Sequence, residues 1–241
     1  MDSTNNYARG QIQAAGLPDR QGISLHGMVV FAHEQVAGKG QRGKSWVTGK
    51  DSNIALSVLI KPLSLRVSQQ FQLSACAAVA VHHFFGKYAG DDTKIKWPND
   101  LYWQDRKAGG ILIENIVSGS GSWDWSIIGI GININQVIFP EELPNPVSLK
   151  QITGTHFDPC ELARELCASL DQQYTRLCTE GFGPVYADYL SCLYKKGGWV
   201  KLRKDNRLFE ALILSVTPEG RLLVKHAIEE EFDFGQLEWV L

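Results

Sequence analysis

Residues 38–45 read Gly-Lys-Gly-Gln-Arg-Gly-Lys-Ser, and this run matches two phosphate-binding motifs that belong to different folds. It fits the dinucleotide fingerprint G-x-G-x-x-G and also the phosphate loop G-x-x-x-x-G-K-[ST]. Both motifs need a strand that leads directly into the loop and a helix that opens directly after it. Here residues 33–37 separate the preceding strand pattern from the first glycine, and residues 46–51 lead into another strand pattern. The sequence therefore disfavours both the Rossmann fold and the P-loop fold.

The loop still suits an anionic ligand. Three glycines allow backbone amides to approach a phosphate, and Lys39, Arg42 and Lys44 would neutralise its charge. The alternative is a solvated hairpin tip whose cations bind nothing, and such tips are common. Composition alone favours phosphate binding only slightly.

Outside the loop, strand patterns and helix patterns are interspersed. Helices are expected at residues 7–15, from Ser68 to a stop at Gly86, after the capping residue Asp158, and at Pro184–Leu193. Short β-branched and apolar runs predict strands at Met28–His33, Asn53–Ile60, Lys94–Trp97, Gly110–Ile116 and Trp125–Ile134. We therefore predict an α/β (α+β) domain with a central mixed sheet.

The pattern changes after Lys195-Lys196-Gly197-Gly198, a polar glycine pair that is typical of a domain junction. The periodicity becomes two, with short strands predicted at Trp199–Leu202, Leu208–Val216, Leu222–His226, Glu231–Phe234 and Leu237–Val240. A small β-barrel fits this spacing. The predicted domains are residues 1–194 and residues 195–241.

Composition excludes several classes of protein. The 241 residues carry 24 Lys and Arg against 26 Asp and Glu, so the formal net charge of −2 creates no field that would attract DNA. The longest apolar runs are far shorter than a membrane span, and no apolar signal region is visible at the N-terminus. The five cysteines form no C-x-x-C pair and are interpreted as reduced, core-filling thiols of a cytoplasmic protein.

Residues 129–135 read Gly-Ile-Gly-Ile-Asn-Ile-Asn, a perfect alternation. As a strand, this run places isoleucines on one face and bare glycines and asparagines on the other. Glycine inside a strand allows something to approach the backbone closely, so a ligand floor is one interpretation. Packing of the bare face against another backbone or a helix, with the asparagines exposed, is an equally weighted alternative.

Two further segments carry charge beside turns. Asp100 follows Lys96-Trp97-Pro98-Asn99 and could hold magnesium or accept a proton, and Lys107 could contact a phosphate or carboxylate. An ordinary Asn-Asp turn and a solvated basic hairpin are the favoured explanation of these residues, by roughly two to one. His82-His83 is assigned no chemistry.

Taken together, five motifs resemble those of the biotin protein ligases, in the order that this family shows. They are Ser3-Thr4-Asn5, Glu34–Trp46 (which contains the glycine loop), Lys96–Tyr102, Arg106–Leu112 and Gly129–Asn133. The resemblance covers residues 1–135 by motif and the remainder by architecture, because the family carries an SH3-like β-barrel at its C-terminus.

The resemblance implies an enzyme that joins biotin to ATP, releases pyrophosphate, and transfers the biotinyl group from biotinyl-5′-AMP to one lysine of a biotin carboxyl carrier domain. The usual acceptor is acetyl-CoA carboxylase or a related carboxylase. Mg²⁺ would accompany ATP. A homodimer is compatible with the family pattern, and neither DNA nor a membrane is an expected partner.

The resemblance also assigns site residues. Those expected around biotin are Ser3, Thr4, Asn5, Gln35, Gly38, Lys39, Gly40, Gln41, Lys107, Gly110, Gly129 and Gly131. Those expected at the nucleotide are Arg42, Lys44, Trp46, Asn99, Asp100 and Asn133. Lys107 and Arg42 would offset negative charge on the reactants, and Asp100 would bind the metal or accept the proton of the acceptor lysine.

The chain departs from the family pattern in its loop and in its domain content. Lys39 and Gln41 stand where family loops commonly have arginine, so the cation that meets the phosphate stays open. The helix-turn-helix segment of the repressor-type ligases is not found, so no DNA-binding role is expected. A lipoate-dependent enzyme and a non-catalytic biotin or nucleotide sensor are the main alternatives, followed by a P-loop NTPase.

Overall fold

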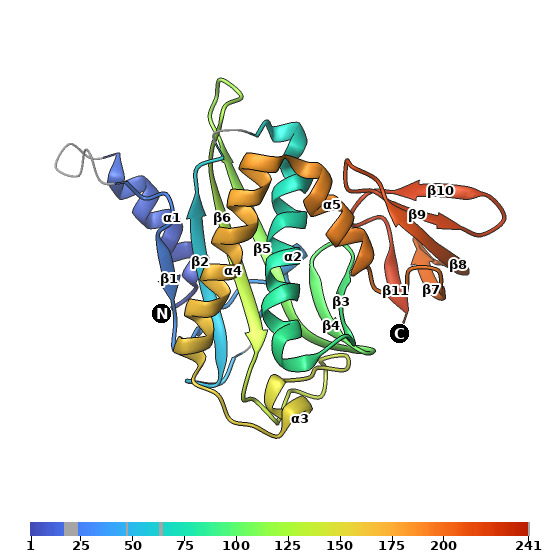
Figure 1. Cartoon of the computed structure of the whole chain (residues 1–241), viewed down its shortest axis with the longest axis horizontal. Coiled ribbons are helices and arrows are strands. Elements are labelled where there is room, and N and C mark those ends of the chain that lie inside the picture. Colours follow the sequence, from blue (N-terminus) through green and yellow to red (C-terminus); the bar gives the residue numbers. More distant parts are fainter. Residues whose placement is uncertain (17–23, 47, 63–64, 241) are drawn as a thin grey trace. The chain divides into compact units, whose positions relative to one another are not determined.

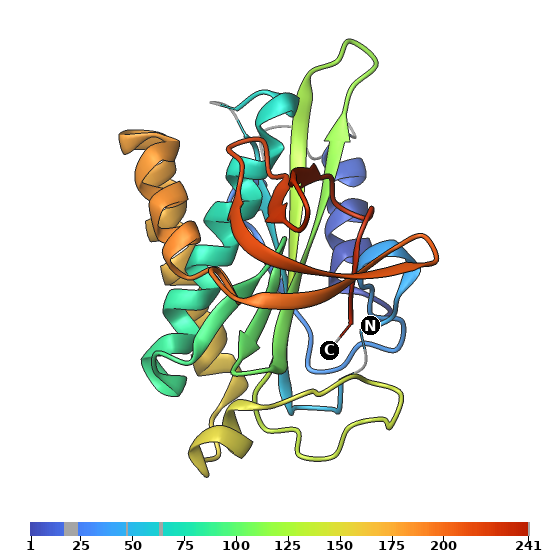
Figure 2. The ribbon, with the colours of Figure 1, turned by 90° about the vertical axis from the view of Figure 1, so that its right-hand side faces the viewer.

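The computed structural model describes residues 1–16, 24–46, 48–62 and 65–240 (Figures 1 and 2). Its contacts divide the chain into two compact units, each built from two separate stretches of sequence. The first unit comprises Met1–Val67 and Arg106–Ser169, and the second comprises Ser68–Asp105 and Leu170–Leu241.

The first unit contains an antiparallel arrangement of β1 (Val29–Phe31), β2 (Asn53–Ile60), β6 (Trp123–Asn133) and β5 (Arg106–Val117), which are neighbours in that order. Figure 2 shows β5 and β6 as one long hairpin. This corrects the prediction of a mixed sheet for the strand pairs of this unit. A parallel pair needs a crossover of a dozen or more residues, whereas β5 and β6 are joined by the short turn at residues 118–122.

The strand patterns of the first unit are confirmed. β2 has the predicted bounds, and all eight of its residues are buried, which explains why six of them are apolar. The alternation in β6 is also confirmed, since Ile128, Ile130 and Ile132 are each at most 3% exposed.

Helix α1 (Thr4–Ala15) contacts β1, β2 and β6 (Figure 1). It begins three residues before the predicted start, at Thr4, and Ser3 at the N-cap makes no side-chain capping hydrogen bond. The polar side chains at this end are buried and bond to other segments, so they do not cap the helix. Ala8 of α1 packs with Leu59 and Ile127 in an apolar cluster.

Two helices follow β6 along the chain. The short α3 (Leu149–Thr153) was not predicted, and it begins with a capping box in which Ser148 and Gln151 bond reciprocally. The helix expected after Asp158 is confirmed as α4 (Pro159–Glu180), which runs from the first unit into the second. The Asp158 carboxylate accepts hydrogen bonds from two backbone amides of the first turn.

In the second unit, α2 (Gln70–Ala89) packs against α5 (Phe182–Ser191). The predicted stop at Gly86 is wrong, because the helix continues for another three residues and ends at Gly90. Gly90 has a φ of 74°, which only glycine adopts without strain. Gly86 tolerates the helical conformation and its carbonyl bonds to the amide of Gly90.

The second unit also contains two sets of strands. β3 (Thr93–Lys96) pairs with β4 (Asp100–Trp103), a strand that was not predicted. All five strands expected after residue 195 are present, and their pairs are antiparallel. They are β7 (Trp199–Lys204), β8 (Arg207–Val216), β9 (Leu222–Lys225), β10 (Glu229–Phe232) and β11 (Glu238–Val240), in the order β10-β9-β8-β7-β11.

All five cysteines are free thiols, as predicted. Cys76 and Cys192 are buried, whereas Cys178 is exposed and so does not fill the core. Position 178 lies near the end of α4, where part of the helix surface faces solvent. Among the described residues, no helix has the length and apolarity needed to cross a bilayer.

Candidate active site

The glycine loop forms a narrow turn without a following α-helix. Lys39 and Ser45 form an antiparallel bridge, and the amides of Gly40 and Trp46 bond to the carbonyls of Lys44 and Gly38 at 2.7 and 2.8 Å. Only a single 3-10 turn, Gln41–Gly43, lies within it. Because phosphate loops and Rossmann motifs require an α-helix at this point, the structure confirms that neither motif applies.

Close packing explains the first glycine of this loop. A Cβ on Gly38 would lie 2.3 Å from the carbonyl oxygen of Trp46, which no side chain could tolerate. The cations expected to neutralise an anion, Lys39, Arg42 and Lys44, are all exposed on the loop surface. The loop is therefore tightly closed at its base, and its charges are accessible.

A hydrogen-bond network joins α1, the start of the loop and β2. Gln35 Oε1 accepts from the backbone amide of Thr4 at 2.8 Å and from its hydroxyl at 3.1 Å. Ser57 Oγ lies 2.7 Å from Thr4 Oγ1 and 2.6 Å from Asn5 Oδ1. The structure thus brings together three residues predicted for one ligand, although 31 residues separate Thr4 from Gln35. Ser3, beside them in sequence, is also buried.

Two members of this network were not predicted. Ser57 is fully buried in β2, and Glu114 of β5 accepts a hydrogen bond from Asn5 Nδ2 at 2.7 Å. Glu114 also forms an ion pair with Arg9 of α1 at 3.2 Å. A serine within an apolar strand and a glutamate among isoleucines were the available signals, and neither specifies a partner without the fold.

The bare face of β6 is covered by two side chains. A Cβ on Gly129 would lie 2.3 Å from Asn5 Oδ1, and one on Gly131 would lie 2.4 Å from Trp46 Cε2. The glycines therefore admit side chains from α1 and the loop, as the packing alternative predicts. Its expectation of exposed asparagines is wrong, because Asn133 and Asn135 are only 5% and 7% exposed. The indole nitrogen of Trp46 is buried there without a hydrogen-bond partner. A buried donor without a partner is unusual in a folded protein and marks this position as a candidate ligand contact.

Lys107 is held through its backbone. Its amide bonds to the carbonyl of Asn145 at 2.8 Å, and its carbonyl accepts from the amide of Val147 at 2.9 Å. The neighbouring guanidinium of Arg106 donates to Pro146 O at 2.6 Å. Asn133, which was predicted to lie near the nucleotide, donates its amide to the carbonyls of Lys107 and Val147 at 3.5 and 3.1 Å.

Gly110 and Gln41, which were also predicted to lie around biotin, belong to the first unit. Gly110 of β5 is directly opposite Gly131 of β6 in the sheet register, so two glycines face each other across the hairpin. Gln41 donates to the carbonyl of Ile111 at 3.4 Å. The loop therefore contacts the strand that begins beside Lys107.

Asn99 and Asp100 belong to the second unit, at the turn between β3 and β4. The carbonyl of Pro98 accepts from Tyr189 Oη at 2.9 Å, and Trp97 Nε1 donates to Gly220 O at 2.9 Å. Burial raises the pKa of Tyr189, which keeps this hydroxyl protonated and able to donate. Asn99, next to Pro98 in this turn, is buried, with 5% of its surface exposed.

Lys96 precedes this turn in an aromatic environment. Its ammonium donates to Tyr102 Oη at 3.1 Å and lies 4.7 Å from the centre of that ring and 5.2 Å from the ring of Trp239. Such cation–π contacts stabilise a partly desolvated ammonium. Lys96 therefore fixes the end of β3, and Asp100 lies directly opposite it in the register.

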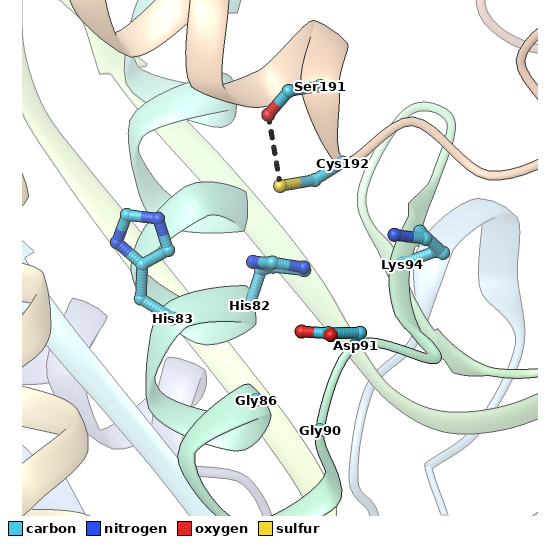
Figure 3. A pocket seen from close by; sticks show the side chains of 8 residues that line it. All are labelled: His82, His83, Gly86, Gly90, Asp91, Lys94, Ser191 and Cys192. Carbon is cyan, nitrogen blue, oxygen red and sulfur yellow. Dashed lines mark hydrogen bonds between the residues drawn. The ribbon is translucent and has the colours of Figure 1, made fainter.

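A cavity in the second unit, shown in Figure 3, contains none of the predicted site residues. It is lined by His82, His83, Gly86, Gly90, Asp91, Lys94, Ser191 and Cys192. Burial lowers the pKa of His82 and raises the pKa of Cys192, so both side chains are neutral near pH 7. A neutral thiol is a poor nucleophile, and we do not assign the active site to this cavity.

Comparison with known proteins relates this chain to a protein family. The model of the biotin/lipoate A/B protein ligase family matches residues 3–133, a span that contains the loop, the network and Lys107. The biotin–[acetyl-CoA-carboxylase] ligase of Paracoccus denitrificans is 30% identical over 204 residues, which cover 81% of this chain and 83% of that protein.

Two other relatives extend the comparison. The bifunctional ligase/repressor BirA of Bacillus subtilis (strain 168) is 32% identical over 83% of this chain, but the match spans only 62% of BirA's length. The biotin protein ligase of Aquifex aeolicus, solved in complex with biotin and ATP, superposes with a TM-score of 0.79 at 24% identity and covers 99% of this chain and 95% of that chain. This last likeness shows the fold. Because the family model spans more than half of the sequence and contains most of the site, the chain belongs to the biotin/lipoate A/B protein ligase family.

Proposed function

We propose that this chain is an ATP-dependent biotin protein ligase, which forms biotinyl-5′-AMP and transfers biotin to a lysine of a biotin carboxyl carrier domain. The observation that carries the proposal is the buried network of Thr4, Asn5, Gln35 and Ser57. A ureido ring both donates and accepts hydrogen bonds, so it suits a site rich in hydroxyl and amide groups. Ser3 lies beside this network.

In the first half-reaction, a carboxylate oxygen of biotin attacks the α-phosphorus of ATP. The bond between the α-phosphorus and the bridging oxygen breaks, and pyrophosphate leaves. Both reactants are anionic, so cations must offset their repulsion. Lys107 and Arg42 are the proposed catalytic cations. Lys39 and Lys44 lie on the same exposed loop as Arg42.

The nucleotide site is proposed to comprise Trp46, Asn99, Asp100 and Asn133, in addition to the loop cations. The unpartnered indole nitrogen of Trp46 supports its part in this assignment. Mg²⁺ in phosphate sites usually takes one or two carboxylates together with phosphate oxygens and water. Asp100 is the proposed carboxylate, and a single carboxylate suits a metal that arrives with the triphosphate.

In the second half-reaction, the acceptor lysine attacks the carbonyl carbon of biotinyl-AMP, and AMP leaves. With an ordinary pKa near 10.4, only about one lysine in a thousand is neutral at pH 7.4. Asp100 is the proposed base for this proton. An Asp100→Asn variant should transfer biotin from preformed biotinyl-AMP more slowly, and an unchanged rate would contradict the role.

The remaining parts of the proposal concern organisation. We assign residues 1–194 to catalysis and the five-stranded sheet after residue 195 to an SH3-like barrel, which its short antiparallel strands support. We place the enzyme in the cytoplasm, where carrier domains of acetyl-CoA carboxylase or related carboxylases would be its partners. A homodimer stays a prediction.

The test is ATP–pyrophosphate exchange with biotin, with lipoate and with no acid. Exchange that depends on biotin would support adenylation without any knowledge of the carrier. Exchange that depends on lipoate would favour the related lipoate chemistry, and biotin binding without exchange would favour a sensor. A mass increase of one biotinyl group on a purified carrier domain would then test the second half-reaction.

A further inference from the structure

The carboxamide of Asn5 has hydrogen bonds at both ends. Its Nδ2 donates to Glu114 Oε2 at 2.7 Å, and its Oδ1 lies 2.6 Å from Ser57 Oγ. Asn5 is 3% exposed and packs directly on Gly129, where a Cβ would lie 2.3 Å from Oδ1. The side chain is thus buried between α1 and the β5–β6 hairpin.

Glu114 determines which end of this carboxamide points in which direction. A carboxylate only accepts hydrogen bonds, so it selects the NH₂ end of Asn5 and leaves the oxygen for Ser57. Arg9 donates to the other carboxylate oxygen at 3.2 Å, so both oxygens of Glu114 accept hydrogen bonds from α1. The Glu114 side chain is only 24% exposed, so the hydrogen bond is partly shielded from water.

The orientation of Asn5 affects the rest of the network. Ser57 has one hydroxyl proton, and its oxygen lies within 2.7 Å of both Thr4 Oγ1 and Asn5 Oδ1. If the carboxamide were reversed, Nδ2 would donate to Ser57 and the proton directions at Ser57 and Thr4 would change. Gln35 bonds to Thr4, so the change would extend to Gln35, which precedes the glycine loop.

We propose that Glu114 is a positioning residue that fixes the carboxamide of Asn5 and thereby makes the site selective for a ureido ring over an apolar dithiolane ring. This inference rests on the proposed biotin ligase function and adds a source of its specificity. A site built around fixed polar groups rejects a ligand that cannot pair with them, by factors of up to about 10⁴–10⁵. If the donor pattern is not fixed, part of that discrimination is lost.

The experiment exchanges the amide of Asn5 and the carboxylate of Glu114, first one at a time and then together. Asn5→Asp places two carboxylates against each other, and we expect the KM for biotin to rise about 100-fold or more, in line with the cost of an unpaired charge pair. Glu114→Gln permits either carboxamide orientation, and we expect a rise of about tenfold. In the double variant, the amide at position 114 donates to the carboxylate at position 5, which still accepts from Ser57.

The expected result is that the double variant recovers to within about threefold of Glu114→Gln, because the hydrogen bond is restored with reversed polarity. The KM for ATP should stay within about twofold of wild type in all three variants. Selectivity for biotin over lipoate in pyrophosphate exchange should fall in both single variants and recover in the double variant. Asn6→Asp is the matched control, because Asn6 makes its 2.7 Å bond to Asp2 at the exposed surface.

A double variant as poor as Asn5→Asp would overturn the inference, because Asn5 would then act by direct contact alone. Equal rises in the KM values for biotin and ATP would also overturn it, since a general structural defect would explain them. If Asn5→Asp fails to fold, Glu114→Gln tests the inference alone. Its KM for biotin should rise while its KM for ATP does not, and its selectivity for biotin over lipoate should fall. If the wild-type chain bound no biotin in calorimetry, the proposed function itself would fail, and that outcome differs from a failed exchange in a chain that binds biotin.

Discussion

The indole of Trp46 lies against Gly131 so closely that a Cβ at position 131 would be 2.4 Å from Cε2 of the ring. The glycine at position 131 is therefore required by the side chain of Trp46 itself. Because Trp46 follows the glycine loop directly, this contact fixes the end of the loop on strand β6. The position of the loop depends on a residue 85 places further along the chain.

Gly131→Ala should displace Trp46 from its position on β6. We expect biotin-dependent exchange to fall at least about tenfold, since even small misplacements of catalytic groups are costly. Gly119→Ala is the matched control, because a Cβ there has no neighbour within 4 Å. Equal activities of the two variants would show that the contact is dispensable.

Trp46→Phe should weaken nucleotide binding while leaving the stability of the chain nearly unchanged. The buried indole nitrogen has no hydrogen-bond partner in the protein, so its removal sacrifices no intramolecular bond. We expect the free energy of unfolding to change by less than about 1 kcal/mol, because the relief of an unsatisfied donor offsets the smaller ring. Nucleotide affinity, measured by calorimetry, should weaken about tenfold if this nitrogen donates to the ligand.

Arg106→Gln should loosen the segment that holds Lys107. The guanidinium donates to Pro146 O at 2.6 Å, and hydrogen bonds from charged groups contribute about 1.5–3 kcal/mol. We expect faster proteolytic cleavage between residues 136 and 146 and a higher KM for biotin. Arg106→Lys keeps a cationic donor and should recover part of the loss, whereas an unchanged cleavage rate in Arg106→Gln would contradict the prediction.

Gly220→Ala should destabilise the chain. Gly220 has a φ of +96°, and a Cβ there would lie 2.6 Å from the ring of Phe71. Strain and overpacking each cost about 1–3 kcal/mol, so the midpoint of urea unfolding should fall clearly. Gly183→Ala, within α5 and without a neighbour for the Cβ, should instead stabilise by up to about 1 kcal/mol.

Cys76 should make stability depend on pH in the alkaline range. Burial in α2 raises the pKa of this thiol from the ordinary 9.0 to about 12. Above pH 9 the unfolded chain loses this proton before the folded chain does, so the unfolded state binds fewer protons and the free energy of unfolding decreases as pH rises. The loss should develop between about pH 9 and 12. The effect is the difference between the free energies of unfolding of the wild type and of Cys76→Ala, measured by urea unfolding at each pH. Identical pH profiles of the two proteins would exclude it.

The sequence predicted elements whose signals are local. The apolar run Asn53–Ile60 and the capping pattern at Asp158 were sufficient because a strand period and a helix start are properties of neighbouring residues. The failure at Gly86 has a physical basis, since a glycine costs only about 1 kcal/mol inside a helix and packing of the apolar face outweighs that amount. Strand β4 was missed because its pairing with β3 is a tertiary property.

The candidate site was predictable in part for the same reason. Thr4, Asn5 and Gln35 were found through motifs, and the structure brings them together through bonds across 31 and more residues. Ser57 and Glu114 stayed invisible because their importance comes entirely from what faces them. The motif also named Asn133 but not its partners, since its amide bonds to the backbone carbonyls of Lys107 and Val147, which only the fold brings to it.

The bond from Trp97 to Gly220 joins positions 123 residues apart. A ribosome synthesises the turn between β3 and β4 long before it synthesises the β8–β9 turn that accepts this bond. Domains generally fold as their sequence emerges, and closure of long loops is slow. The Trp97–Asp100 turn therefore acquires its final supports only when almost the whole chain has been made, so a nascent or prematurely terminated product should lack the formed turn.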